Sequence, residues 1–276
     1  MTESTERDYV LGTHDDEIER LGLQHRVWRP RALDAWRRAG FTTGQTLIDI
    51  GCGPGYASMD LAEIVGVTGR IASVDRSRRF LDVLEKSRRI RGLHQIDPIE
   101  LDLDATDIPP SAVQGADGGW ARWIFAFLKN PRTALRRVGS AIRPGGSLVI
   151  HEYFDYGTWR LAPRELDIED FVVAVMQSWR ADGGEPDIAL DLPRWLAELG
   201  FEIQSLRPIV DIVQPSNFVW RWPQSFVEVN LRRLVDLGRM TPDRASVIAR
   251  AVAAAQAKPH TYMITPAVLE IIAIRR

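Results

Sequence analysis

A glycine-rich turn is the first feature of this sequence that could bind a ligand. The segment LIDIGCGPGYASMDLA begins at Leu47 and joins an apolar strand to a helix through three closely spaced glycines, Gly51, Gly53 and Gly55. Glycines there let the chain reverse sharply and let a ligand approach the backbone with no Cβ in the way. A dinucleotide turn would read G-x-G-x-x-G and aim the helix N-terminus at a pyrophosphate. Here the sixth position is Tyr56, and Asp49 precedes the first glycine by two residues, where its charge would repel phosphate.

Two more acids are expected where the next two strands end. Asp75 follows the last glycine by 20 residues (75 − 55), where a carboxylate can accept both hydroxyls of a ribose. Asp104 follows the third strand and can accept from an adenine amino group, which every adenosine cofactor carries. Asp49 favours a ligand with an ammonium group and a sulfonium charge, which is S-adenosylmethionine (SAM). NAD-dependent oxidoreduction is the competing interpretation, disfavoured by Asp49 and Tyr56.

A parallel sheet would place these residues together. Apolar β-rich runs alternate with helical patterns over residues 46–153, as a sheet with crossover helices requires. Ser77 should cap a helix that ends near Gly92. Asn130 can cap another helix, which has Pro131 in its first turn. We expect an α/β fold with a doubly wound, mostly parallel sheet of seven strands: residues 47–50, 70–75, 99–103, 118–125, 147–153, 201–210 and 268–274.

Two stretches interrupt the α/β rhythm, residues 156–190 and 215–260, and we expect them to be helical cap insertions. Residues 1–45 are expected to form two helices, 17–28 and 31–39, that cover the cofactor. The α/β core would then comprise residues 46–155, a continuation at 191–214 and a final strand within 261–276. The sequence shows no repeat, low-complexity segment or linker that would separate independent domains.

Four segments, LIDIGCGPG, IASVDRS, LDLDATDIP and AIRPGGSLVI, resemble in order and spacing the motifs of class I SAM-dependent methyltransferases. The resemblance is strong over residues 46–153 and is nearest to the ubiquinone/menaquinone-biosynthesis-type and related small-molecule enzymes. It implies a seven-stranded sheet with a reversed final hairpin. It also implies that Asp49 and the three glycines line the methionine half of SAM, and that Asp75 lines the ribose. The adenine would lie against Asp104 and Ala105.

The resemblance extends to the end of the fourth strand, where relatives often read WCRxVLEHLPDP and this chain reads WARWIFAFLKNP. Arg122 would lie beside the methionine portion of SAM. Ala126 and Phe127 stand where Glu and His are common, so the chain lacks an acid/base pair that some relatives carry. This departure keeps a non-catalytic SAM-binding module open as an alternative.

The segment YVLGTHDDEIERLGLQ resembles the cofactor-covering helix of some members of this group. Arg20 and Gln24 lie four residues apart on one helical face and could reach the SAM carboxylate, although a solvated helix face is an equal alternative. Tyr56 and Arg76 are further predicted cofactor residues. Tyr9 is a predicted substrate contact.

A general base could come from the end of the fifth strand, where open α/β sheets place their ligands. We name His151 and Tyr153 as candidate catalytic residues, although His151 could point away from the ligand. Cys52 is expected to be packed rather than nucleophilic. No histidine pair or C-x-x-C has metal-ligand spacing, so no metal is predicted.

Aromatic residues crowd both predicted insertions, and they could line an apolar pocket for a planar or lipophilic substrate or could pack the cap onto the sheet. Those named as candidate substrate contacts are Trp159, Trp179 and Trp222. The leading interpretation is a methyltransferase that transfers a methyl group to an O, N or C atom of a small, largely apolar molecule.

Composition restricts the remaining classes. The 35 Lys and Arg and 37 Asp and Glu give a net charge of −2, which argues against a nucleic-acid surface, and no N-P-P-Y-like motif follows the fourth strand. A nucleic-acid methyltransferase is thus disfavoured, and we keep it as a second alternative to the leading interpretation. A single cysteine, a polar opening segment and the absence of a long apolar run predict a cytoplasmic protein without a membrane span. The oligomeric state is not predicted.

Overall fold

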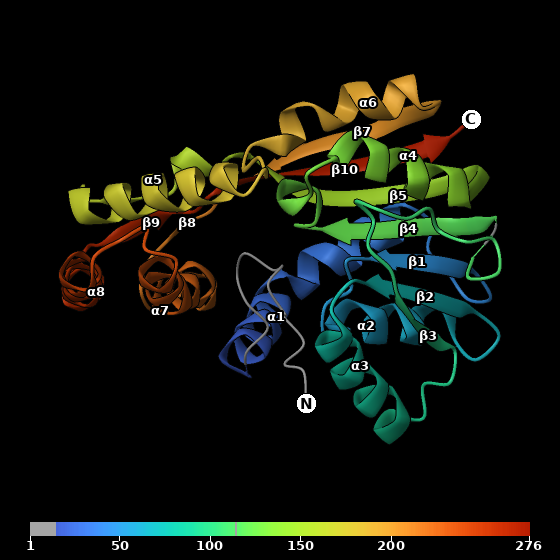
Figure 1. Ribbon diagram of the computed structural model, residues 1–276, viewed down its shortest axis with the longest axis horizontal. Coiled ribbons are helices and arrows are strands. Elements are labelled where there is room, and N and C mark those ends of the chain that lie inside the picture. Colours follow the sequence, from blue (N-terminus) through green and yellow to red (C-terminus); the bar gives the residue numbers. More distant parts are fainter. Residues whose placement is uncertain (1–14, 114) are drawn as a thin grey trace.

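A seven-stranded sheet forms the core of the protein in the computed structural model, which describes residues 15–113 and 115–276 (Figure 1). The five strands from β3 to β5 are parallel, whereas β10 is antiparallel to both of its neighbours. This arrangement confirms the predicted doubly wound, mostly parallel fold. In spatial order the strands are β3 (Ile96–Glu100), β2 (Arg70–Asp75), β1 (Thr46–Ile50), β4 (Ala116–Arg122), β5 (Ile142–Asp155), β10 (Ala267–Arg275) and β7 (Phe201–Ile209).

Helices cover both faces of this sheet. On one face an apolar cluster joins the strands to α1 (Asp15–Arg38), α2 (Tyr56–Val65) and α3 (Arg78–Arg91). On the other face a second cluster joins them to α4 (Pro131–Ala141) and α6 (Leu192–Glu198). Because both faces are covered, the carboxyl ends of the parallel strands are the place where side chains can meet a ligand.

The helix ends are mostly those expected from the sequence. The Ser77 hydroxyl accepts a hydrogen bond from the Phe80 N–H at 3.3 Å, and Gly92 ends α3 with a φ of 67°. Pro131 lies in the first turn of α4, as predicted. Asn130 takes the predicted N-cap position, but its side chain makes no capping hydrogen bond.

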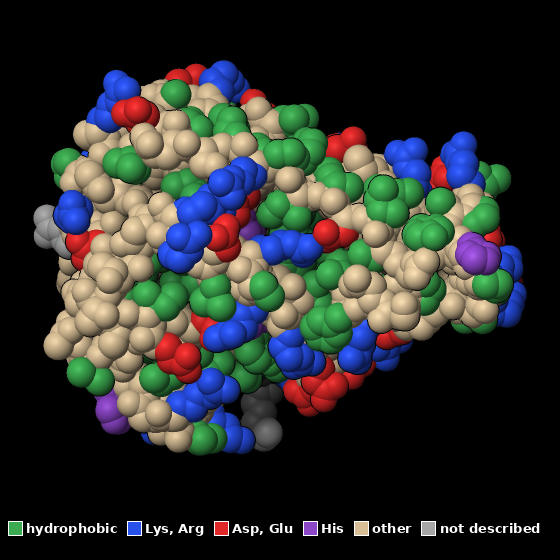
Figure 2. All heavy atoms as spheres, turned by 180° about the vertical axis from the view of Figure 1, so that it is seen from behind, with side chains coloured by type: hydrophobic (Ala, Val, Ile, Leu, Met, Phe, Trp, Pro, Cys, Tyr) green, Lys and Arg blue, Asp and Glu red, His purple; other side chains and the backbone are tan. Residues whose placement is uncertain are grey.

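A cap of three helices and a small sheet projects from the core (Figure 1; at the right in Figure 2). The helices are α5 (Leu166–Ala181), α7 (Arg221–Asp236) and α8 (Pro242–Ala257), and the sheet has the order β6 (Arg160–Ala162), β9 (Tyr262–Ile264), β8 (Ile212–Val213). The two predicted cap insertions are mainly helical, as expected, and hold α5, α7 and α8. The small sheet was not predicted, and it extends the core into the cap, because β8 follows β7 closely and β9 leads into β10.

Helix α1 lies between the core and the cap. It is one continuous helix through Pro30 and not the two helices that we predicted. Three ion pairs fix it to the cap helix α7, to the chain before β8 and to β10: Asp16–Arg232, Arg31–Asp211 and Arg38–Glu270. Within the described ranges, no helix is both long and apolar enough to cross a bilayer.

Two strands end earlier than predicted. β3 ends at Glu100 and not at residue 103. β4 ends at Arg122, because Trp123 takes a φ of 51° before the short 3-10 helix η1 (Phe125–Phe127). Because both strands end early, the residues that follow Glu100 and Arg122 take positions other than those that the predicted strands would give them.

Gly55 has a packing role that can be measured. Its φ is 83°, and an added Cβ would lie 2.2 Å from Leu84 Cδ1, whereas an added Cβ at Gly53 (φ 55°) would meet nothing within 4 Å. We predict that Gly55→Ala lowers the free energy of unfolding by about 2–4 kcal/mol, from left-handed strain plus overpacking, and Gly53→Ala by about 1–2 kcal/mol from strain alone. Urea unfolding measures both; equal losses would contradict the packing role of Gly55.

Candidate active site

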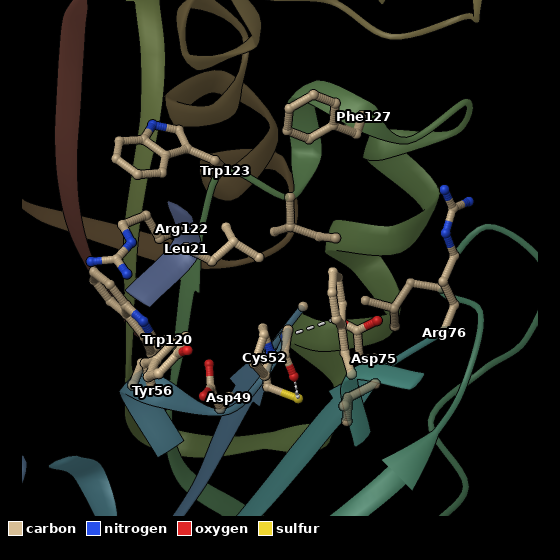
Figure 3. A pocket seen from close by; sticks show the side chains of 18 of the residues that line it. Leu21, Asp49, Cys52, Tyr56, Asp75, Arg76, Trp120, Arg122, Trp123 and Phe127 are labelled. Carbon is tan, nitrogen blue, oxygen red and sulfur yellow. Dashed lines mark hydrogen bonds between the residues drawn. The ribbon is translucent and has the colours of Figure 1, made fainter. Parts of the chain in front are cut away.

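A cavity opens at the carboxyl ends of β1, β2, β4 and β5 and has about 1170 Å³ of empty space, its mouth included. Its walls come from the glycine turn, helix α1, the segment after β3, the segment after β4, and the cap helices α5 and α7. Figure 3 shows Asp49 and Cys52 at one end of this cavity and Trp123 and Phe127 at the other, with Arg122 between them.

The glycine turn forms one wall. Gly51 and Gly53 line the cavity with positive φ, and the Gly53 N–H donates to Asp75 Oδ2 at 2.8 Å. The open space beside Gly53 leaves its backbone accessible to a ligand. Gly55, predicted as a cofactor residue, does not line the cavity, because it packs against Leu84.

Asp49 is a buried carboxylate on the cavity wall. The Ser58 hydroxyl donates to Asp49 Oδ2 at 2.5 Å, and the Ser73 hydroxyl donates to Ser58 Oγ at 2.9 Å. Burial raises the pKa of Asp49 to about 6, in spite of the Ser58 hydrogen bond and the charge of Arg122. At neutral pH the site therefore holds an ionised carboxylate that can bind a cation.

Arg122, at the end of β4, brings a buried positive charge to the same cavity. Its Nη2 lies 3.2 Å from His25 Nδ1, while its Nη1 is buried and has no hydrogen-bond partner among the described residues. Burial lowers the pKa of Arg122 to about 10, so the guanidinium stays charged at neutral pH. An unpaired N–H of a buried cation is costly unless a ligand accepts from it.

Asp75 ends β2 and lines the cavity beside Arg76 (Figure 3). Its Oδ1 accepts from the Ser77 N–H and its Oδ2 from the Gly53 N–H, both at 2.8 Å. Burial raises the pKa of Asp75. Each carboxylate oxygen has a second lone pair, so Asp75 can still accept from two ribose hydroxyls.

The predicted adenine residues need correction. Asp104 lies outside the cavity, because its carboxylate accepts the backbone N–H groups of Lys129 and Asn130 at 3.0 and 2.8 Å, ahead of α4. Ala105 is also outside the lining. Because β3 ends early, the earlier acid, Asp102, lines the cavity with Leu101 and Leu103.

Helix α1 contributes Arg20, Leu21 and Gln24 to the wall. Arg20 is buried and donates to both carboxylate oxygens of Glu17 at 2.6 and 2.7 Å and to Gln24 Oε1 at 2.8 Å. The alternative of a solvated helix face was therefore wrong for Arg20 and Gln24. Because Glu17 occupies its guanidinium edge, Arg20 is a weaker carboxylate receptor than Arg122. Tyr9 lies outside the described residues.

Five aromatic side chains line the end of the cavity away from Asp49: Trp123, Phe127, Tyr153, Trp179 and Phe226. Trp123 stacks on Tyr153 with ring centroids 5.3 Å apart, and Phe127 meets Trp179 edge to face at 4.6 Å. We refer to this set as the aromatic chamber. Of the five, only Tyr153 and Trp179 were predicted as site residues from the sequence. The aromatic content of the cap and the WARWIFAF run were the signals available for the other three.

Three further predicted site residues, in addition to Gly55, Asp104 and Ala105, do not line the cavity. His151 is fully buried between the rings of Trp28 and Trp120 and hydrogen-bonds Glu270 at 3.2 Å, because α1 covers this part of β5. Trp222 stacks on Trp123 at 5.4 Å from behind the chamber, and Trp159 is buried in the cap against Phe171. His151 therefore cannot act as a general base in this cavity.

Buried Glu152 holds the segment that carries Trp123 and Phe127. Its Oε1 accepts the backbone N–H groups of Ile124 and Phe125, both at 2.6 Å. Burial raises the pKa of Glu152 to about 8. Glu152 lies outside the cavity lining, so it shapes the chamber without reaching its interior.

Comparisons with known proteins identify the domain. Residues 48–150 match a family model described as a methyltransferase domain. A demethylmenaquinone methyltransferase of Oceanobacillus iheyensis is 26% identical over 131 residues, 47% of this chain and 52% of that protein. The chain thus spans about half the length of the curated relatives it matches.

Two solved structures share the fold. A putative methyltransferase from Bacillus halodurans has a TM-score of 0.59 at 14% identity and covers 88% of this chain and 97% of its own. The [4+2]-cyclase SpnF has a TM-score of 0.56 at 21% identity, with 89% and 80% covered. Residues 48–150 are a class I methyltransferase domain, and its cofactor is SAM. For this domain the predicted methyltransferase class and the SAM cofactor are confirmed, whereas the predicted small-molecule substrate group stays a prediction.

The described side chains fit that cofactor. The buried Arg122 Nη1 lacks an acceptor, Asp49 offers a carboxylate, and the backbone at Gly53 is open. Among the same residues, no group of three or more His, Cys, Asp or Glu side chains could hold a metal ion.

The pKa of Asp49 generates a prediction about cofactor affinity. Protonated Asp49 cannot pair with the ammonium group of S-adenosylhomocysteine, so affinity should rise with pH through its pKa of about 6. We expect a roughly tenfold gain from about pH 5 to pH 7 by calorimetry. Asp49→Asn should bind more weakly at neutral pH and lose most of this dependence. A wild-type pH profile retained in the variant would exclude Asp49 as its source.

Proposed function

We propose that this chain transfers a methyl group from SAM to an oxygen, nitrogen or carbon nucleophile of a small, planar and largely apolar molecule. The observation that carries the proposal is the aromatic chamber, which continues the same cavity that holds Asp49, Arg122 and Asp75. Such walls bind flat apolar rings through area burial and ring contacts. A nucleic-acid backbone would instead require a basic surface around the cavity mouth.

SAM supplies an electrophilic methyl group on a positively charged sulfur. Arg122 and Asp49 would hold its carboxylate and ammonium groups, and Asp75 its ribose, so that the sulfur faces the aromatic chamber. The five chamber rings would exclude water and orient the acceptor. Glu17 offsets the charge of Arg20 at the chamber wall, which keeps the surroundings of the acceptor close to neutral.

Proximity would carry most of the rate. His151 lies outside the cavity, and Glu152 is engaged by two backbone N–H groups. Of the five chamber side chains, Tyr153 is the one that carries a hydroxyl group. We propose that Tyr153 orients the nucleophilic atom of the acceptor, and that no indispensable acid/base residue exists in this chamber.

The direct test is transfer of labelled methyl from SAM to metabolite, RNA and DNA fractions. We expect label in the small-molecule fraction that partitions into organic solvent. Label in nucleic acid would favour the nucleic-acid alternative. SAM binding without transfer to any fraction would favour a non-catalytic SAM-binding module.

Trp179 and Trp159 form a matched pair for testing the chamber, because both are buried tryptophans of the cap but only Trp179 lines the cavity. Trp179→Ala should raise the acceptor KM or lower kcat by about tenfold or more and leave SAM affinity nearly unchanged. Trp159→Ala should lower the melting temperature, with KM near wild type in the folded fraction. Steady-state kinetics and thermal unfolding measure both effects. Equal KM changes in the two variants would contradict the assigned chamber.

A further inference from the structure

Arg122 is a buried cation whose local partner is neutral. Its Nη2 lies 3.2 Å from His25 Nδ1, its Nη1 has no hydrogen-bond partner among the described residues, and no ion pair joins it to a described carboxylate. The indole rings of Trp120 and Trp123 lie 5.7 and 5.3 Å from its guanidinium carbon. Asp49 acts on Arg122 only through space. The positive charge of Arg122 is thus held in place but not paired.

His25 is itself fixed from the other side. It is a buried residue of α1, and its Nε2 lies 3.0 Å from Asp60 Oδ2 on α2. Asp60 also accepts from Arg29 Nε at 2.7 Å. A carboxylate can only accept, so His25 Nε2 carries the hydrogen of the neutral ring and Nδ1 presents its lone pair to Arg122. The Tyr56 ring stacks on the His25 ring with ring centroids 6.1 Å apart.

We propose that His25, oriented by Asp60, is a positioning residue that holds Arg122 for the carboxylate of the cofactor. A neutral acceptor can fix the guanidinium without cancelling its charge, which a carboxylate in the same place would do. Arg20 illustrates the contrast, because Glu17 pairs with its guanidinium edge. The inference rests on the proposed cofactor-binding role of Arg122 and adds the His25–Asp60 pair to it.

The test compares SAM with decarboxylated SAM, which keeps the adenosine, sulfonium and ammonium groups and lacks only the carboxylate. Calorimetry at neutral pH gives the affinity of each variant for both ligands. The ratio of the two affinities isolates carboxylate recognition. A general loss of packing would weaken both ligands together and leave the ratio unchanged.

Four variants divide the roles. Arg122→Met removes the proposed receptor. In His25→Gln the amide reaches the position of Nε2 and can still meet Asp60, but it offers no acceptor at the position of Nδ1. His25→Asn restores an acceptor near Nδ1. Arg29→Ala is the matched control, because Arg29 contacts the same carboxylate of Asp60 but its side chain is 45% exposed and does not line the cavity.

We expect Arg122→Met to lower SAM affinity about 10- to 100-fold and His25→Gln to lower it about three- to tenfold, with decarboxylated SAM changed by less than about twofold in both. His25→Asn should recover part of the loss. Arg29→Ala should keep the wild-type ratio. If His25→Gln does not fold, Asp60→Asn tests the same link and should reduce the ratio in the same direction.

Three outcomes would contradict the account at different levels. A ratio that collapses in Arg122→Met but stays at the wild-type value in His25→Gln and Asp60→Asn overturns the role of His25 and leaves the receptor intact. Equal losses for both ligands in Arg122→Met overturn the receptor itself. A wild-type protein that binds neither ligand overturns the proposed function.

Discussion

The site depends on two opposite charges that are buried in one cavity without forming an ion pair. Asp49 and Arg122 lie at the ends of β1 and β4, and each is held by neutral partners: the Ser58 hydroxyl for Asp49 and the His25 ring for Arg122. Burying such groups is unfavourable unless a ligand completes them. A zwitterionic amino-acid group would pair with both charges. The free protein would then bear the unfavourable free energy of burying Asp49 and Arg122, and cofactor binding would relieve it.

The other elements serve this arrangement. Parallel pairing of β1 with β4 sets Asp49 beside Trp120, and the glycine turn leaves room above the strand ends. Helix α1 then closes the cavity from the side and brings His25 to Arg122, while its ion pairs to α7 and to the chain before β8 connect the cofactor wall to the cap. The aromatic chamber therefore lies where the core, α1 and the cap meet.

The sequence predicted the features that depend on local spacing. The patterns of β1 and β2 predicted the positions of the glycine turn, Asp49 and Asp75 directly. The family resemblance predicted the reversed final strand. The prediction that Asp104 contacts the adenine was wrong, because β3 ends at Glu100, three residues before the predicted end at residue 103. As a result Asp102 lines the cavity in place of Asp104. The prediction of His151 as a general base was wrong, because the periodicity of the sequence does not reveal that α1 covers this part of β5. His25 was missed because its contact with Arg122 joins residues 97 apart in the sequence.

The central claim is that Arg122 and Asp49 hold the amino-acid end of the cofactor and thereby direct its sulfur into the aromatic chamber. A crystal structure of the protein with S-adenosylhomocysteine tests it most directly. We expect the ligand carboxylate on Arg122 Nη1, the ammonium on Asp49, the ribose hydroxyls on Asp75, and the sulfur facing Tyr153 and Trp123. A carboxylate bound to Arg20 instead, or a sulfur directed away from these rings, would contradict it.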